Sequence, residues 1–519
     1  MCAHPGLRLA FRVLFLSGAL GFAFAWNGAA AEKAGGTPPS TAAPETETTF
    51  FESVDVQVID VDVVVTDREG RPVFGLQQAD FELFEDGKKM AITNFYGPST
   101  SSAQSSSRPE APFVTTPPPP GPPPEALPDT QRFRLAVFLD HRTLSAVARR
   151  RLGSSLEDFF LARLAAGEDL LIAGYDGDLR LRPVLQGSSA ATAETLRTIL
   201  RDELGRAARG QEIEAERRRI LQDLRSAILP GVTDTGPDAS EAEAAAVFGS
   251  IRLFAQARDS QNRDTLLAVA RTIDVLAGLS GRKALLWIHG GMQMRPAESL
   301  FEAFQRKYAG TPIQDTASTL EAFDHDASPA LQAVAERANA RRVTLYGLAL
   351  PERGAGISAE NVGDALQARD LGRFDDFARE SDVTIAATST GGLAVSDPSN
   401  PVTFLAHVRS DLEAAYSLGY SPSPRAIGSL HRLEVRTRDR SLRVRHRIAG
   451  RERTTDERMA ERTSTALLLD SANDEMNPLE AAIEFEAERP AVAEPKGAKL
   501  PADAVQVSIL VKVPMAKLV

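Results

Sequence analysis

The spacing of apolar residues changes along the chain, and each change predicts a different kind of structure. Over residues 50–97 apolar and polar positions alternate, as at Val54, Val56 and Val58, and this period of two is typical of β-strands with one buried face. Asp86-Gly87 predicts a hairpin, because this dipeptide adopts the backbone angles of tight hairpin turns. We therefore expect a small N-terminal β unit over residues 50–97.

Over residues 131–424, apolar runs alternate with segments of helical spacing, which predicts an α/β domain built on a doubly wound, mostly parallel sheet. The expected strands are Phe133–Asp140, Leu170–Tyr175, Leu179–Leu185, Ala284–His289, Val343–Leu350, Val383–Ala386 and, as the last strand of the sheet, Tyr416–Tyr420. The expected helices are Ala146–Ala165, Ala190–Ile228, Glu241–Val275, Pro329–Ala340, Asp364–Glu380 and Thr403–Ala415. The charged helical insertion at about 190–263 is long for such a connection and is a second candidate surface.

The period of two returns at residues 425–450 and predicts a second hairpin. We expect it to pair with the N-terminal β unit, because a lone hairpin is marginally stable in water. Residues 451–478 predict a polar linker or helix, and residues 479–519 predict the start of a C-terminal β module. Either those last strands join the earlier β unit, or the natural protein continues.

The remaining segments are not expected to pack. Residues 1–31 predict a secretory signal peptide, since Arg8 and Arg12 flank the start of an apolar run and Ala29-Ala30-Ala31 follows it. We expect a secreted or periplasmic protein. Residues 32–49 predict a disordered leader and residues 98–130 an extended Pro/Ser-rich linker. No later segment is apolar over the ~20 residues that span a bilayer.

Composition narrows the function classes. The net charge of −11 and pI of about 5.4 argue against a nucleic-acid partner. We interpret Arg149–Arg151 and Arg217–Arg219 as solvated helix faces, because acidic residues are interleaved around them. The one cysteine, Cys2, lies in the predicted signal peptide, so the mature chain is expected to lack disulfides, thiolate metal ligands and cysteine nucleophiles.

The candidate site is the carboxyl edge of the predicted sheet. The apolar run that ends at Asp140 places that carboxylate at this edge, where open α/β folds bind their ligands. The other residues of the expected binding surface also come from the ends of predicted strands or the turns nearby. The full set is Asp140, Arg142, Thr143, Ser145, Asp176, His289, Gly290 and Thr390.

Several segments resemble exported bacterial proteins related to the von Willebrand factor type A (VWA) domain, and the likeness covers most of residues 50–519. They are Val63–Asp67, Gly75-Leu76, Asp80–Gly87, Val137–Asp140, Thr390–Gly392 and Tyr416–Pro422. The resemblance implies a doubly wound sheet whose carboxyl edge holds Mg²⁺ or another hard cation through Asp-x-Ser-x-Ser, a later Thr and a later Asp. It also implies a domain that binds proteins and does not catalyse.

This metal-ion-dependent adhesion site is degenerate in the present chain. Only Asp140 remains of its first motif, because Arg142 and Leu144 occupy the hydroxyl positions. His289 stands in place of the later Asp, and Thr265 is a loosely aligned candidate for the later Thr. We expect the Arg142 guanidinium to pair with Asp140 in place of a metal, so that no cofactor is required.

The conclusion from the residues is an exported, non-enzymatic protein-binding module with an adhesion or scaffold role. One alternative is a shifted site in which Asp140, Thr143, Ser145 and His289 hold a cation, with a preference for a transition metal such as Zn²⁺. A second is a secreted hydrolase that uses Asp140 and His289, with His141 and Ser145 completing a triad, although no Gly-x-Ser-x-Gly turn is present there. A purely structural envelope role is a third.

Overall fold

The structure is a computed structural model of the chain. It describes residues 58–98, 133–166, 168–184, 190–206, 210–227, 237–311, 313, 321–351, 383–396, 400–422, 429–451, 453–469, 482–485, 489–490, 505–506 and 509–512. The expected signal peptide, the leader, the linker beyond Pro98 and the helix expected at Asp364–Glu380 lie outside the described residues. Within the described part, no helix combines the length and the apolar character needed to cross a membrane.

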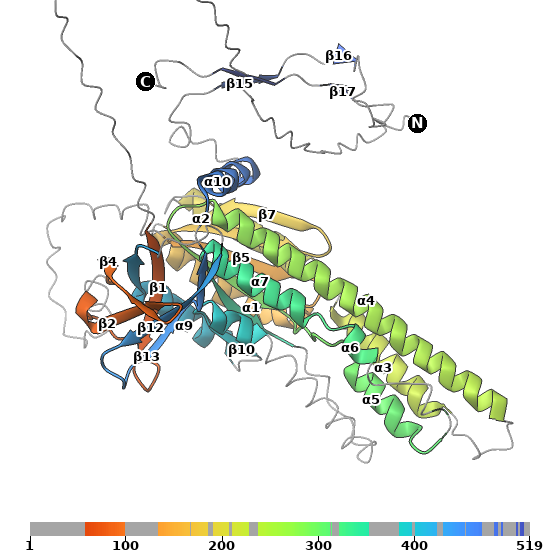
Figure 1. Cartoon of the computed structure of the whole chain (residues 1–519). Helices are drawn as coiled ribbons and strands as arrows, with labels where there is room; N and C mark the ends of the chain where they lie inside the picture. Colours follow the sequence, from red (N-terminus) through yellow and green to blue (C-terminus); the bar gives the residue numbers. More distant parts are fainter. Residues whose placement is uncertain are drawn as a thin grey trace, which may run out of the picture. The chain divides into compact units, whose positions relative to one another are not determined.

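A six-stranded sheet forms the centre of the α/β part, with the strand order β10-β9-β8-β5-β6-β7. Its strands are β5 (Phe133–Asp140), β6 (Asp169–Tyr175), β7 (Leu179–Val184), β8 (Arg282–His289), β9 (Val343–Ala349) and β10 (Ala394–Ser396). All neighbours are parallel except β7, which turns back antiparallel to β6 at one edge. The prediction of a mostly parallel α/β sheet is confirmed (Figure 1).

The central strands are apolar along their length because both faces of the sheet are covered. In β5, Ala136 and Phe138 belong to one core, whereas Leu135, Val137 and Leu139 belong to the other. The first core includes residues of α4 (Pro237–Ala277) and α7 (Ser328–Arg341). The second includes residues of α1 (Ala146–Ala165) and α9 (Pro401–Ala414).

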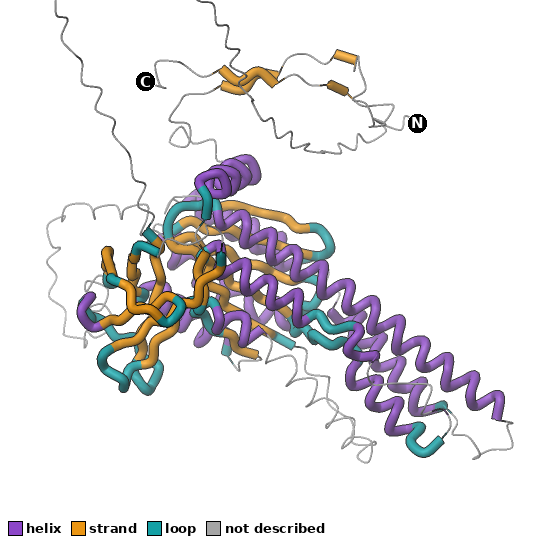
Figure 2. The backbone as a smooth tube through the Cα atoms, viewed as in Figure 1, coloured by secondary structure: helices purple, strands orange, loops and turns teal. Residues whose placement is uncertain are grey.

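The charged insertion is divided differently from the prediction. In place of one helix from residue 190 to 228, the structure has α2 (Ala190–Gly205), which packs on the sheet, and a separate α3 (Gly210–Ser226). Helix α4 runs for 41 residues, and Figure 2 shows it continuing past the strands beside α3 and α5 (Glu298–Lys307). These three helices share their own core around Phe254, Phe301 and Phe304, and the short α6 (Glu321–Asp324) follows.

Two antiparallel four-stranded sheets combine strands that precede the α/β part in sequence with strands that follow it. Their strand orders are β13-β1-β11-β4 and β14-β12-β2-β3. Their strands are β1 (Ile59–Thr66), β2 (Phe81–Glu85), β3 (Lys88–Met90), β4 (Ile92–Tyr96), β11 (Tyr416–Tyr420), β12 (Leu430–Thr437), β13 (Arg443–His446) and β14 (Ala449–Arg451); a short 3₁₀ helix, Gln78–Asp80, precedes β2. Alternate residues of both sheets form one core, to which Val61, Leu83 and Val435 belong. Segments from before and after the α/β part therefore share a core.

The prediction that Tyr416–Tyr420 is the last strand of the parallel sheet was wrong. This strand, β11, lies antiparallel between β1 and β4. Its tyrosine hydroxyls have partners in the N-terminal β unit. Tyr416 donates to Val73 O, in the segment between β1 and β2, at 2.9 Å, and Tyr420 donates to Glu85 of β2 at 3.0 Å. Buried hydroxyls need such partners, which helps to place the strand there.

The strand predicted at Val383–Ala386 was also wrong, because residues 383–389 are helical. Val383, Ala386 and Ala387 are buried against the first sheet core, whereas Ile385 is 66% exposed. This is the i, i+3, i+4 spacing of a helix face.

The C-terminal part begins with α10 (Thr455–Leu469), which packs on α4, where Thr465 Oγ1 donates to Val275 O at 2.8 Å. Beyond it, β15 (Ala482–Phe485) pairs with β18 (Ile509–Lys512), and β16 (Arg489–Pro490) pairs with β17 (Val505–Gln506). Among the strands that the structure describes, these four pair only with one another.

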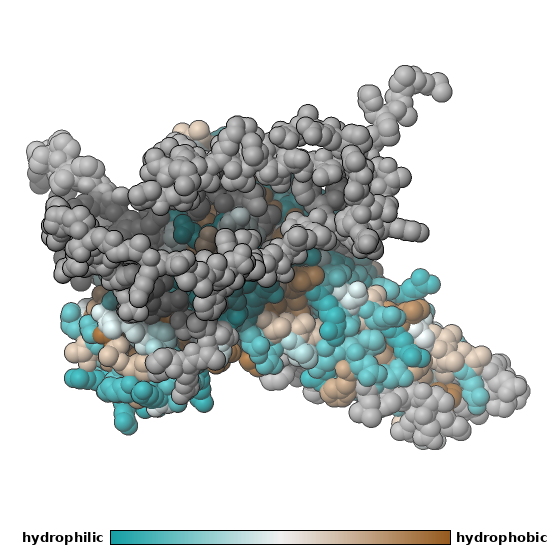
Figure 3. All heavy atoms as spheres, turned by 45° about the horizontal axis from the view of Figure 1, so that its top comes forward, coloured by the Kyte–Doolittle hydropathy of each residue, from teal (hydrophilic) through white to brown (hydrophobic). Residues whose placement is uncertain are grey.

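One face of the described part is mainly polar (Figure 3). In the view of Figure 3, hydrophilic residues predominate on the described part and apolar residues are scattered among them. Large exposed apolar side chains include Leu253 of α4, Phe323 of α6 and Met459 of α10. Single exposed apolar residues of this kind are common on protein surfaces and do not indicate a binding site.

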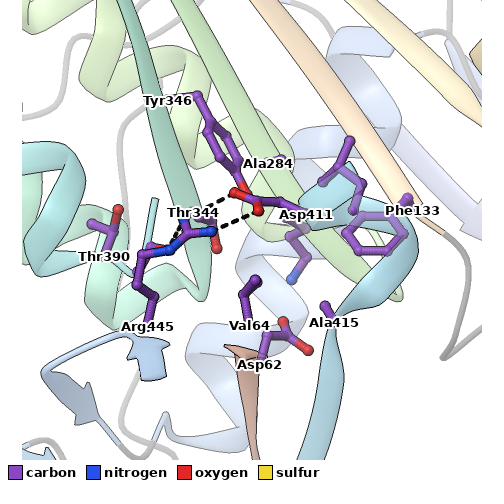
Figure 4. Close-up of a pocket in the computed structure, with 13 residues that line it drawn as sticks. Asp62, Val64, Phe133, Ala284, Thr344, Tyr346, Thr390, Asp411, Ala415 and Arg445 are labelled. Atoms are coloured by element: carbon purple, nitrogen blue, oxygen red, sulfur yellow. Dashed lines mark hydrogen bonds and ion pairs between the residues drawn. The ribbon is translucent and has the colours of Figure 1, made fainter. Parts of the chain in front are cut away.

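The parallel sheet and the antiparallel sheets meet at the amino ends of the parallel strands. Arg445 of β13 donates to Asp411 of α9 through both Nη atoms, at 2.9 and 2.6 Å, and these side chains are 19% and 8% exposed. Figure 4 shows the pair beside Tyr346, in a cavity that Asp62 and Lys283 also line. The bidentate pair therefore ties the two parts together.

Breaking this pair should destabilise the protein. In Asp411→Ala the half-buried guanidinium of Arg445 loses its buried carboxylate partner, and we expect the free energy of unfolding to fall by about 3 kcal/mol. The matched control is Glu434→Ala, which breaks an ion pair with Arg436 whose side chains are 42% and 58% exposed and should cost less than about 1 kcal/mol. Urea denaturation of the full chain measures both, and equal losses would contradict this account of the junction.

Candidate functional site

Asp140, Asp176 and His289 lie at the carboxyl edge of the parallel sheet, because they end or follow the neighbouring strands β5, β6 and β8. The register sets Asp140 beside Tyr175 and Leu139 beside Ile288, so the three strands end at nearly the same level. The turn after β5 and the loop after β8 meet there, through a hydrogen bond between Thr143 and Gly290.

The Asp140 carboxylate is fully buried and accepts two local hydrogen bonds. Thr143 Oγ1 donates to Oδ2 at 2.7 Å, and Arg142 N donates to Oδ1 at 3.1 Å. Burial raises the pKa of Asp140, while these bonds and the nearby cationic side chains act in the opposite direction. Both carboxylate oxygens are therefore engaged by the turn that follows the strand.

The expected ion pair between Arg142 and Asp140 was wrong. Arg142 Nη1 lies 3.4 Å from Tyr175 Oη and 3.8 Å from Asp264 Oδ2. The main chain of the turn after β5 folds back over Asp140. Arg142 N donates to its carboxylate, and Leu144 N donates to its backbone carbonyl oxygen at 3.0 Å. The amide of Arg142 thus binds Asp140, and its guanidinium is directed to other groups.

Thr143 bridges the ends of two strands. Its hydroxyl donates to Asp140 and accepts from Gly290 N at 2.9 Å. Position 290 requires glycine, because a Cβ there would lie 1.9 Å from Thr143 O. Thr143, which lies between the two hydroxyl positions of the expected motif, is therefore the residue whose side chain contacts Asp140.

Ser145 and Leu144 have structural roles. Ser145 is the N-cap of α1, where its hydroxyl accepts from Ala148 N at 3.1 Å, and it is 3% exposed. Leu144 is fully buried in the second sheet core.

His289 is fully buried at the end of β8. Its Nδ1 accepts from Gly291 N at 3.2 Å, and its ring lies 4.9 Å from the Trp287 ring. Its Nε2 is buried without a hydrogen-bond partner among the described residues. Burial lowers the pKa of His289 to about 4, so the imidazole is neutral at pH 7.

Asp176 belongs to a network of charges beside Asp140. Arg180 and Arg206 donate to it at 2.8 and 3.0 Å. Burial opposes its ionisation, but these bonds outweigh burial and lower the pKa of Asp176 to about 2. Arg180 also contacts Glu203 of α2, which lies 2.9 Å from His141 Nε2. Glu203 carried no local sequence signal, because its partners are distant in the chain.

The interpretation of the arginine runs as solvated faces was wrong for Arg149. This side chain is 3% exposed and donates to the carbonyl oxygens of His141 and Leu144, both at 3.2 Å. Its neighbours Arg150 and Arg151 are exposed, as expected. The turn after β5 leaves carbonyl groups that need a donor, and α1 supplies it.

Thr390 lies at the opposite edge of the sheet, so its expected place beside Asp140 was wrong. Thr390 Oγ1 accepts from Leu345 N at 2.9 Å, near the start of β9, and Figure 4 shows it in the amino-edge cavity. Because residues 383–389 form a helix, Thr390 precedes the parallel strand β10 and so comes at its amino end.

The donor set at the carboxyl edge does not fit a metal ion. The Asp140 oxygens accept hydrogen bonds within the turn, and the Ser145 hydroxyl caps a helix. Leu144, at a hydroxyl position of the expected motif, has no oxygen in its side chain. Among the described residues, no group of three or more His, Cys, Asp or Glu side chains is placed to hold a metal ion. Hard cations require several oxygen ligands, and the oxygens of the predicted set are already bound within the protein.

A cavity of about 80 Å³, partly open to solvent, lies at this edge beside Thr143 and Gly290. Its polar lining consists of Arg142, Arg217, Arg258, Gln261, Asn262, Thr265 and Gln293, and we call it the arginine cavity. Arg217 comes from α3, and Arg258 comes from α4. Sequence reasoning marked this insertion as a candidate surface but singled out none of its arginines for the site, because arginines on charged helices are ordinarily solvated.

Comparison with known proteins adds no assignment. No family model matches the chain, and no curated protein matches it. Function is therefore argued from the geometry of the site.

The Thr143 bridge should contribute to stability through its hydroxyl. Thr143→Val keeps the shape but leaves Asp140 and Gly290 N without this partner, and we expect the free energy of unfolding to fall by about 2 kcal/mol. Thr143→Ser, which retains the hydroxyl, should lose less than about 1 kcal/mol. The two variants are compared by urea denaturation, and a Val variant no weaker than the Ser variant would argue against the bridge.

Neutral His289 should make stability depend on pH. Between about 6.5 and 4 the unfolded histidine binds a proton that the folded one does not, so stability falls as pH falls through this window, by on the order of 3 kcal/mol in total. His289→Asn keeps an acceptor for Gly291 N and should show a flatter dependence. Denaturation curves across the window test this, and equal slopes would assign the dependence to other groups.

Proposed function

We propose that the chain is an exported, non-catalytic protein-binding module with a VWA-like doubly wound architecture and an adhesion or scaffold role. Its working surface is the carboxyl edge of the parallel sheet, at a degenerate metal-ion-dependent adhesion site. One observation carries the proposal: the cavity at this edge is lined by arginines and side-chain amides, whereas the candidate catalytic groups Asp140, Ser145 and His289 are buried.

The rival function is a hydrolase that uses Asp140 and His289. Its nucleophile would be Ser145, whose hydroxyl caps α1, and its base would be a histidine. His141 lies against Glu203, and His289 accepts from Gly291 N. Among the described contacts, none joins Ser145 to either histidine, and this supports binding over catalysis.

Site-specific photocrosslinking tests the binding surface. A photoreactive residue placed at Gln261, on the rim of the arginine cavity, should capture a protein from the exported proteins of the source organism. The same residue at Met459 of α10, which is 62% exposed, is the control. Unlabelled wild-type chain should suppress the adduct, and Arg142→Glu chain should not. Equal adducts at both positions, or equal suppression by both competitors, would contradict the proposed surface.

Activity and metal assays test the rival. The purified chain should not turn over ester, peptide or phosphate substrates, with or without EDTA, and Mg²⁺, Mn²⁺ and Zn²⁺ should not shift its melting temperature. Turnover that disappears in Asp140→Asn would establish the hydrolase. A melting shift that disappears in Asp140→Ala would establish a metal-dependent binder.

A further inference from the structure

The arginine cavity is formed by elements that are far apart in the chain. Arg142 belongs to the turn after β5, Ile213 and Arg217 to α3, Arg258 to α4, and Gln293 to the loop after β8. The charged insertion therefore builds one wall of a cavity whose other wall is the carboxyl edge of the sheet.

The guanidinium groups of this cavity carry charge that its own residues offset only in part. Arg258 Nε is buried and has no hydrogen-bond partner among the described residues. Burial lowers the pKa of Arg258, and the positive charge of Arg142 acts in the same direction, whereas Glu216 and Glu212 oppose it. Those two glutamates are exposed. A bound anion would relieve the repulsion between Arg142 and Arg258.

The existing contacts leave the cavity available to an anion. Arg142 is 3.8 Å from Asp264, whose side chain is 58% exposed, and Arg217 Nη2 donates to Ser299 at 3.2 Å. An ion pair with so exposed a carboxylate is weak, so a ligand can compete with it. Guanidinium groups present two parallel donors that match a carboxylate.

We infer that the arginine cavity binds the carboxylate side chains of an acidic segment in a partner protein. This inference rests on the proposed function and names the chemistry of the partner. The apolar lining residues Ile213, Phe254 and Met292 can contact the methylene groups of a glutamate, and the amides of Gln261 and Gln293 can bind a peptide backbone. A nucleic acid would meet the net charge of −11 over a large surface, whereas a short acidic segment needs only the cavity.

The probe is a fluorescein-labelled peptide with consecutive glutamates between Gly-Ser flanks, titrated into the full chain and followed by fluorescence anisotropy. We expect binding that weakens with salt, and at least tenfold weaker binding to Arg258→Gln, since a hydrogen bond to a charged group contributes about 1.5 kcal/mol or more. Arg258→Lys keeps the charge but loses the two parallel N–H donors of the guanidinium, so its affinity for the peptide should be intermediate. Arg436→Gln on β12 makes the same change in net charge and should bind like wild type.

Several outcomes overturn the inference. They are no binding of the glutamate peptide, equal binding of the matched glutamine peptide, and equal binding by Arg258→Gln with an unchanged melting temperature. Competition with inorganic phosphate and with free glutamate separates the two anions, and a site saturated by phosphate but not by the peptide also overturns it. If the inference fails while the Gln261 adduct persists, the binding surface stands and its ligand is not acidic.

Discussion

A buried carboxylate at the end of the central strand is the constraint on which the carboxyl edge depends. Asp140 has no contact with solvent, so its oxygens must be bound inside the protein. The following turn does this with the Arg142 amide and the Thr143 hydroxyl, and the same hydroxyl accepts from Gly290 N of the loop after β8. The ends of β5 and β8 are thereby joined, and the Arg142 side chain is left to line the arginine cavity.

The same turn explains the charge of the arginine cavity at this edge. Arg142 extends into this cavity, Leu144 is buried in the core, and the serine that follows caps a helix. The positive charge that lines the arginine cavity comes from guanidinium groups. The helices of the insertion bring Arg217 and Arg258 to this edge, which gives a physical reason for so long a connection between β7 and β8.

The antiparallel sheets depend on a different constraint. Neither the N-terminal strands nor the later hairpin could bury an apolar face alone, so they pair, with β12 beside β2 and β13 beside β1. Tyr416, Leu418 and Tyr420 of β11 complete this core. The bidentate pair between Arg445 and Asp411 then fixes the layers to the α/β part at the edge away from the arginine cavity.

The local pattern of apolar residues was enough to predict the parallel strands and to place Asp140 and His289 at strand ends. This is because hydrophobic periodicity depends only on residues that are close in sequence. It was not enough to predict which strands pair with one another or which side chains form hydrogen bonds and ion pairs. Tyr416–Tyr420 follows a helix as a parallel strand would, yet its hydroxyls donate to acceptors of the N-terminal β unit, Val73 O and Glu85. Thr390 was misplaced because the short helix at residues 383–389 was taken for a strand. Glu203, Arg149 and Arg258 acquire their roles only from groups distant in sequence. Tertiary structure decided these points, since the hydrogen-bond and charge partners of a side chain are set by which segments pack together.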